Sequence, residues 1–169
     1  MSSSRLKFGF ECEHFVEDLL TEEILYTVPS GLPMDGNGHL VETRSLPYNS
    51  SIATLESFLE RRELLAAQLS NLNLRMVTKD SHTYPNKTET AGFHLHFSKQ
   101  DKDNSVRWSP DELQVIIGKI KAEFGAVGKI RTVPFEETRE KPYGWEYRRL
   151  PATIDPADVA KWLMKEFKQ

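Results

Sequence analysis

Four short segments of the chain alternate apolar and ionisable side chains, and this alternation restricts the fold most strongly. Each segment carries two ionisable residues two positions apart, and in a β-strand such residues project from the same face. The residues beside them are mostly apolar. The four pairs are Glu11 and Glu13, Glu42 and Arg44, His94 and His96, and Glu146 and Arg148. We therefore predict strands that bury one face and gather the ionisable groups on the other.

The same alternation indicates the type of sheet. A parallel sheet is covered on both faces, so its strands are continuous apolar runs. We therefore predict an α+β fold, in which an antiparallel sheet carries its helices on one face and its chemistry on the other. The predicted strands span residues 6–15, 24–28, 39–46, 73–78, 91–98 and 145–150, and the predicted helices span 52–71, 109–124 and 155–167. The polar segment around Pro85 and the long stretch 131–144 are predicted to be loops, the second a functional or mobile one.

The apolar residues of the alternation predict the core. Phe8, Phe10 and Cys12 fall on one face of the first strand, so Cys12 is expected to be a packed core residue rather than a nucleophile. Tyr26 and Phe58 are two further core candidates.

Composition narrows the class of protein. We expect the 169 residues to form a single domain over 1–169, with the serine-rich residues 1–5 as a flexible tail. The 22 basic and 25 acidic residues give a net charge of −3, which argues against a nucleic-acid or anionic-membrane partner. The single cysteine excludes an internal disulfide. No apolar stretch approaches about 18 residues and no signal sequence is evident, so we expect a soluble, cytoplasmic protein. No sequence feature fixes an oligomeric state.

The paired residues also predict a kind of chemistry. Four glutamates meet only two arginines in these pairs, and clustered carboxylates raise one another's pKa unless a cation keeps them ionised. Mg²⁺ and Mn²⁺ prefer carboxylate oxygen, and an imidazole nitrogen can complete a site for Mn²⁺ or Zn²⁺. A metal ion together with arginines is what a transferring phosphoryl group requires. The pattern thus favours metal-dependent phosphate chemistry.

Each pair taken alone has a simpler interpretation. A Glu-x-Glu pair is usually a solvated face of a sheet, and a Glu-x-Arg pair is most often a structural ion pair. A His-x-His pair is often exposed or hydrogen-bonded without a metal. The occurrence of four such pairs in one short chain is what favours a site.

Three of the motifs resemble those of a known family. Gly9-Phe10-Glu11-Cys12-Glu13, Gly92-Phe93-His94-Leu95-His96 and Trp145-Glu146-Tyr147-Arg148 resemble the strand motifs of carboxylate–amine ligases with the glutamine synthetase fold. The nearest branch is the phage and bacterial amidoligases, whose strands carry Gly-x-Glu-x-Glu, Gly-x-His-x-His and Glu-x-Arg in this order. Asp35, seven residues before Glu42, also matches an acidic pair of the glutamate–cysteine ligases.

This resemblance implies a curved antiparallel sheet whose concave face binds ATP and two or three Mg²⁺ or Mn²⁺ ions. It assigns His96 to the nucleotide phosphates, and Arg44 and Arg148 to the transferred phosphoryl group or a substrate carboxylate. Lys129, Arg131 and Arg139 are candidates, from position and charge, to close over the phosphates. The metal ligands that the resemblance implies are Glu11, Glu13, Asp35, Glu42, His94 and Glu146.

The activity implied by the resemblance is ATP-dependent amide formation. A carboxylate attacks the γ-phosphate to give an acyl-phosphate, and an amine then displaces phosphate. The expected substrates are a small-molecule or peptide carboxylate and an amine. Two alternatives stay open: a non-catalytic binding or inhibitor module on the same scaffold, and a metal-dependent hydrolase.

Overall fold

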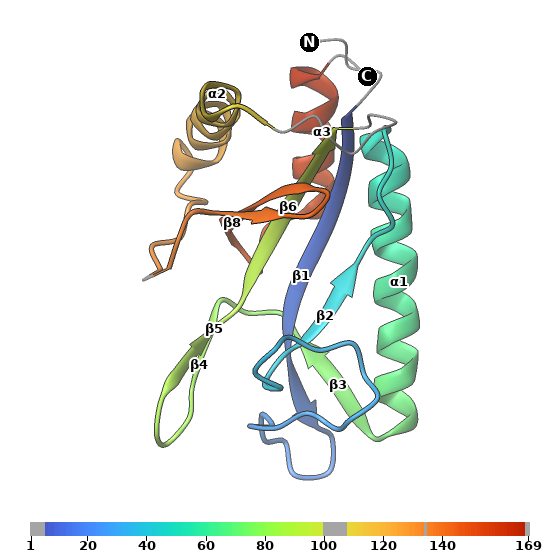
Figure 1. The fold of residues 1–169 in the computed structure, drawn as a ribbon. Coiled ribbons are helices and arrows are strands. Elements are labelled where there is room, and N and C mark those ends of the chain that lie inside the picture. The colour runs from blue at the N-terminus through green and yellow to red at the C-terminus, as the bar shows by residue number, and fades with distance from the viewer. Residues whose placement is uncertain (1–5, 100–107, 134, 168–169) are drawn as a thin grey trace.

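The computed structural model describes residues 6–99, 108–133 and 135–167, and these residues form a mixed α+β fold built on an antiparallel sheet (Figure 1). The strands of this sheet lie in the order β2-β1-β6-β8-β7, and β3 pairs with the C-terminal end of β1. Their bounds are β1 Leu6–Asp18, β2 Val41–Arg44, β3 Leu74–Val77, β6 Gly92–Lys99, β7 Thr138–Lys141 and β8 Gly144–Pro151. Every pairing is antiparallel, so the predicted class of sheet is confirmed.

Three α-helices lie within the described residues, close to where the sequence predicts them. They are α1 Ser51–Asn71, α2 Pro110–Ile120 and α3 Pro156–Glu166. Each begins at a side-chain cap, and at α2 Ser109 and Glu112 form a reciprocal capping box. The second predicted helix changes at its end, because α2 passes into a π-helical segment, Lys121–Gly125.

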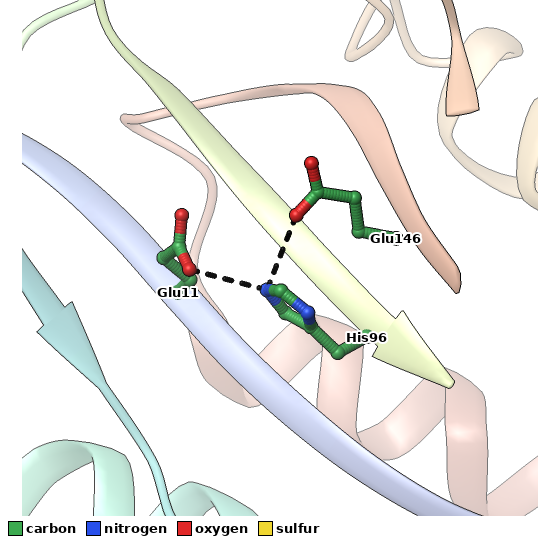
Figure 2. Close-up of side chains that lie close together, drawn as sticks. All are labelled: Glu11, His96 and Glu146. Carbon is green, nitrogen blue, oxygen red and sulfur yellow. Dashed lines mark ion pairs between the residues drawn. The ribbon is translucent and has the colours of Figure 1, made fainter. Parts of the chain in front are cut away.

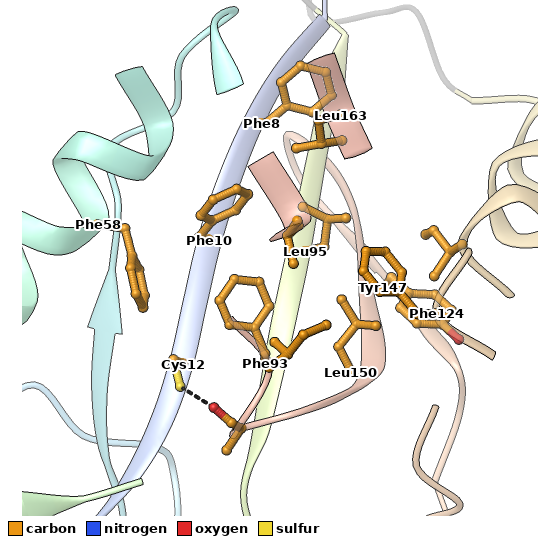
Figure 3. Close-up of a cluster of buried hydrophobic side chains, with 14 of the residues drawn as sticks. Phe8, Phe10, Cys12, Phe58, Phe93, Leu95, Phe124, Tyr147, Leu150 and Leu163 are labelled. Atoms are coloured by element: carbon orange, nitrogen blue, oxygen red, sulfur yellow. Dashed lines mark hydrogen bonds between the residues drawn. The ribbon is translucent and has the colours of Figure 1, made fainter. Parts of the chain in front are cut away.

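The helices pack on the apolar face of the sheet (Figure 3). Phe8, Phe10 and Cys12 of β1 are buried there, in one cluster with Phe58 of α1 and Leu163 of α3. The Cys12 Sγ lies 3.5 Å from the Ala152 carbonyl oxygen, and burial raises the pKa of the thiol to about 12. This burial confirms Cys12 as a core residue. A thiol that stays protonated is also a poor nucleophile.

Two predictions for residues 24–28 are wrong. The segment is not a strand, since it forms only a bridge from Ile24 to Glu17. The backbone leaves β1 after that bridge. The Val28 amide donates to the carbonyl oxygen of Gly38 and not to β1. Tyr26 is 47% exposed and lies outside the core.

The structure also contains strands where the sequence predicts loops. Around Pro85 a separate two-stranded sheet forms from β4 Ser81–Thr83 and β5 Thr88–Thr90. The stretch 131–144 contains β7, which pairs with β8 at the edge of the main sheet. These short strands carry no buried apolar face, so their sequences lack the alternation that identifies the others.

A buried histidine predicts how stability depends on pH. His14 is fully buried, with its ring nitrogens 2.8 and 2.9 Å from the hydroxyls of Thr78 and Thr43, and burial lowers its pKa to about 4. The unfolded chain therefore binds more protons between that value and the ordinary pKa near 6.5, so stability falls as the pH falls through this window. We expect the loss of unfolding free energy to reach about 3 kcal/mol.

Urea unfolding between pH 7 and 4 measures this effect. The variant His14→Gln keeps a neutral hydrogen-bonding side chain that does not titrate, so its unfolding free energy should fall less over the same range. Equal pH dependence in the two proteins contradicts this account of His14.

Within the described residues, no helix is both long and apolar enough to cross a membrane.

Candidate metal centre

The strand register brings the ionisable residues of β1, β2, β6 and β8 together. Glu11 of β1 lies opposite His94 of β6 on one side and opposite Arg44 of β2 on the other. His96 in turn lies opposite Glu146 of β8. Because β1 lies between β2 and β6 in the sheet, Glu11 has ionisable neighbours on both sides.

Two groups of possible metal ligands share Glu11. In the first, His94 Nδ1 lies 3.0 Å from Glu11 Oε1, and His94 Nε2 lies 3.6 Å from Glu13 Oε1. In the second, His96 Nε2 lies 3.3 Å from Glu11 Oε2 and 3.8 Å from Glu146 Oε2 (Figure 2). Within each group the possible ligand atoms lie within 4.8 Å of one another. One carboxylate with two oxygens can thus serve two adjacent cation positions.

Burial and charge shift the pKa values of the clustered glutamates in different directions. Burial alone raises the pKa of Glu11, but the hydrogen bonds and charges of His94 and His96 outweigh it and hold this pKa well below its usual range. Burial raises the pKa of Glu13, against the opposing effects of His94 and the Gly92 amide. Of these two carboxylates, Glu11 therefore stays ionised more readily.

Several buried polar atoms at the second group have no hydrogen-bond partner among the described residues. They are His96 Nε2, Glu146 Oε1 and Arg148 Nε, which make ion-pair contacts of 3.3 Å but no hydrogen bond. Buried polar atoms are nearly always hydrogen-bonded, so these groups can take an ion or water as a further partner. Carboxylate oxygen and imidazole nitrogen are the donor set that Mn²⁺ accepts and Mg²⁺ accepts in part. The residues present therefore fit a divalent cation.

Cations border the glutamates on both sides. Arg44 Nε lies 3.1 Å from Glu11 Oε2, and its Nη2 also contacts Glu42. Arg148 Nε lies 3.3 Å from Glu146 Oε1, with Arg139 and Lys141 of β7 each 3.6 Å from the same carboxylate. An anion bound at this face can therefore contact Arg44 on one side and Arg148 on the other.

Two of the implied metal ligands lie outside both groups. Glu42 pairs with Arg44, and burial together with the charge of Glu11 raises its pKa to about 7. Asp35 lies in the turn before β2, where its Oδ1 accepts a 3.4 Å hydrogen bond from the Leu40 amide. The structure thus brings Glu42 to the edge of the centre but gives the Asp35 carboxylate a local role in the turn.

The two predicted phosphate-binding cations 129 and 131 also differ in position. Lys129 is exposed and lines a separate cavity beside α3. Arg131 donates to the carbonyl oxygens of Ala91 and Arg148, both at 2.9 Å, and so ties β6 to β8. Its guanidinium passes close to Gly92. A side chain at that position would place its Cβ only 1.9 Å from Nη2 of Arg131. Arg131 therefore supports the strands that carry the centre.

Sequence analysis missed two residues beside the centre. Tyr143 is hydrogen-bonded through its hydroxyl to His96 Nδ1, and burial raises the pKa of Tyr143 to about 12, so this hydroxyl stays protonated. Lys141 contacts Glu146 from the edge strand. Arg139 and Lys141 are two positions apart, like the ionisable pairs of the other strands. This spacing is the sequence signal that could have identified Lys141.

A cavity of about 400 Å³ opens beside the shared glutamate. Glu11, Arg44, His96 and Tyr143 line it together with Gly9. A Cβ on Gly9 lies 3.3 Å from the His96 Cβ, so glycine keeps this side of the cavity open. The cavity gives a ligand direct access to both Glu11 and an arginine.

No protein-family model and no curated protein matches the chain.

Proposed function

We propose that the protein is an ATP- and divalent-metal-dependent carboxylate–amine ligase with a glutamine synthetase-like core. The observation that carries this proposal is the pair of ligand groups sharing Glu11, with an arginine contact on each side. The three motifs that resemble amidoligases lie on β1, β6 and β8, the strands that form these groups. Phosphoryl transfer depends on positioning and charge neutralisation, and this set of groups supplies both.

The chain's own residues have distinct tasks in this reaction. Glu11, Glu13, His94, His96 and Glu146 would hold the cations, and Tyr143 fixes the orientation of the His96 ring. Such cations, when bound, would neutralise the charge of the phosphates and orient the reacting oxygen.

Both arginines stabilise charge during transfer. The Arg44 side chain is 60% exposed and lines the 400 Å³ cavity, so it can turn from Glu42 toward a phosphate oxygen. The Arg148 guanidinium packs 4.4 Å from the Phe135 ring centre, which restricts its orientation beside Glu146. In this scheme the acid attacks the γ-phosphate, ADP leaves, and the amine then displaces phosphate from the acyl-phosphate to form the amide.

Calorimetric titration with ATP, in Mg²⁺, in Mn²⁺ and in EDTA, tests the proposal. We expect micromolar binding, near −8 kcal/mol, only when a divalent metal is present. His94→Ala should abolish this binding, whereas His82→Ala on β4, outside both ligand groups, should not. Binding that survives His94→Ala, or no binding under any condition, contradicts the proposal and favours a binding module.

A product assay then separates the ligase from a hydrolase. A ligase releases ADP only when an acid is present and forms an amide with an added amine. Hydrolysis of a phosphate or amide without ATP identifies the hydrolase instead.

A further inference from the structure

A second cavity, of about 500 Å³, lies between α2 and the β7–β8 hairpin. Its walls include Trp108, Leu113 and Ile117 on one side and Trp145 on the other. The two tryptophan rings meet edge to face, with centroids 5.8 Å apart. Tyr143 lines both this cavity and the 400 Å³ cavity beside Glu11, so the two spaces are neighbours.

Two hydrogen-bond donors in this wall lack acceptors. The indole Nε1 atoms of Trp108 and Trp145 are both buried and without a hydrogen-bond partner in the described part of the chain. Trp145 is only 2% exposed, so water does not substitute freely for a partner there. Buried indole N–H groups usually find an acceptor. A ligand that carries a neutral acceptor, such as an amide carbonyl, can satisfy one of them if the ring shifts slightly toward the cavity.

The charges around the cavity favour an anion. Lys99 lines it but is paired with Glu112 at 2.8 Å. Arg139 and Lys141 are therefore the lining cations that face a ligand, against one lining carboxylate, Glu140. Arg139 and Lys141 also lie 3.6 Å from Glu146, so the positive edge of the cavity faces the metal centre. An amine substrate, which is cationic before reaction, is disfavoured by this lining. A carboxylate is favoured.

We propose that this cavity binds the carboxylic-acid substrate, and that this acid is an N-acylated apolar amino acid, as at a peptide C-terminus. The inference rests on the proposed ligase function and names the class of its acid. The carboxylate lies at Arg139 and Lys141, next to Glu146. The apolar side chain packs on Leu113 and Ile117, and the acyl carbonyl accepts from an indole N–H.

Tryptophan fluorescence tests this assignment directly, because two of the three tryptophans line the cavity. The probe is N-acetyl-L-leucine, titrated without ATP or metal. We expect saturable binding at least tenfold tighter than that of N-acetyl-L-leucinamide, which lacks the charge, and of N-acetylglycine, which lacks the apolar side chain. Equal affinities for the three probes, or no saturation with N-acetyl-L-leucine, overturn the assignment.

Matched variants locate the binding. Lys141→Gln should weaken N-acetyl-L-leucine about tenfold, while Lys129→Gln, which removes an exposed lysine beside α3, should not. Trp108→Phe keeps an aromatic ring but removes one N–H, and should weaken the probe several-fold with an unchanged thermal midpoint. Unchanged affinity in both cavity variants overturns the assignment.

The ligase proposal and the cavity assignment can be overturned independently of each other. Metal-dependent ATP binding without probe binding overturns only the cavity assignment. Probe binding without ATP binding overturns the ligase and leaves an acid-binding cavity.

Discussion

Replacing Glu11 by glutamine should abolish both cation positions at once. Its two carboxylate oxygens lie beside His94 and His96 respectively, so each ligand group loses the same charged member. Removal of a residue that only supports a metal ligand typically costs 10- to 100-fold in affinity, so loss of a shared ligand should lower Mn²⁺ affinity by roughly 100-fold or more. Calorimetric titration with Mn²⁺ measures this loss.

A glutamate farther along β1 supplies the control. Glu17 pairs with Arg75 of β3, lies outside both ligand groups, and can be changed to glutamine in the same way. Glu17→Gln should bind Mn²⁺ as the wild type does. Equal Mn²⁺ affinity in Glu11→Gln and Glu17→Gln shows that the assigned residues do not hold the metal.

The largest expected effect on stability is that of Gly144→Ala at the start of β8. A Cβ at Gly144 lies 2.0 Å from the Phe97 carbonyl oxygen and 3.1 Å from the Ser98 Cα. These are backbone atoms of the paired strand β6, so they cannot move aside as a side-chain end can. We expect the unfolding free energy to fall by about 3 kcal/mol, which shifts the thermal midpoint by roughly 6–12 °C.

Gly118→Ala is the matched control for this substitution. Gly118 lies within α2, and a Cβ there meets no atom within 4 Å. Alanine also favours a helix over glycine, so this variant should be as stable as the wild type or up to about 1 kcal/mol more stable. Thermal unfolding followed by circular dichroism compares the two. A Gly144→Ala protein as stable as Gly118→Ala contradicts the close pairing of β8 with β6.

Sequence alone predicts the antiparallel sheet and the face that carries the ionisable residues. This succeeds because alternation fixes side-chain direction within a strand, whatever the strand pairs with. Thus Phe8 and Phe10 enter the core while Glu11 and His94 meet on the opposite face. Register is a long-range property, so the sharing of Glu11 between two ligand groups becomes visible only in the structure.

The remaining features depend on contacts that no local pattern encodes. The edge strand β7 is polar on both faces and forms only because β8 offers hydrogen bonds. Tyr143 reaches His96 from the turn before β8, across a sequence separation of 47 residues. Lys129 and Arg131 are both cationic, yet Lys129 lines a cavity beside α3 while Arg131 donates to the carbonyl oxygens of Ala91 and Arg148. Charge and position in the sequence therefore do not distinguish these two residues.

Diffraction from crystals grown with Mn²⁺ and a non-hydrolysable ATP analogue tests the central claim most directly. Anomalous scattering of manganese locates each ion without reference to the proposed chemistry. We predict one peak among Glu11, Glu13 and His94 and a second among Glu11, His96 and Glu146, with the analogue's phosphates in the adjoining 400 Å³ cavity. Manganese bound elsewhere, or phosphates bound away from Glu11 and Arg44, contradicts the account.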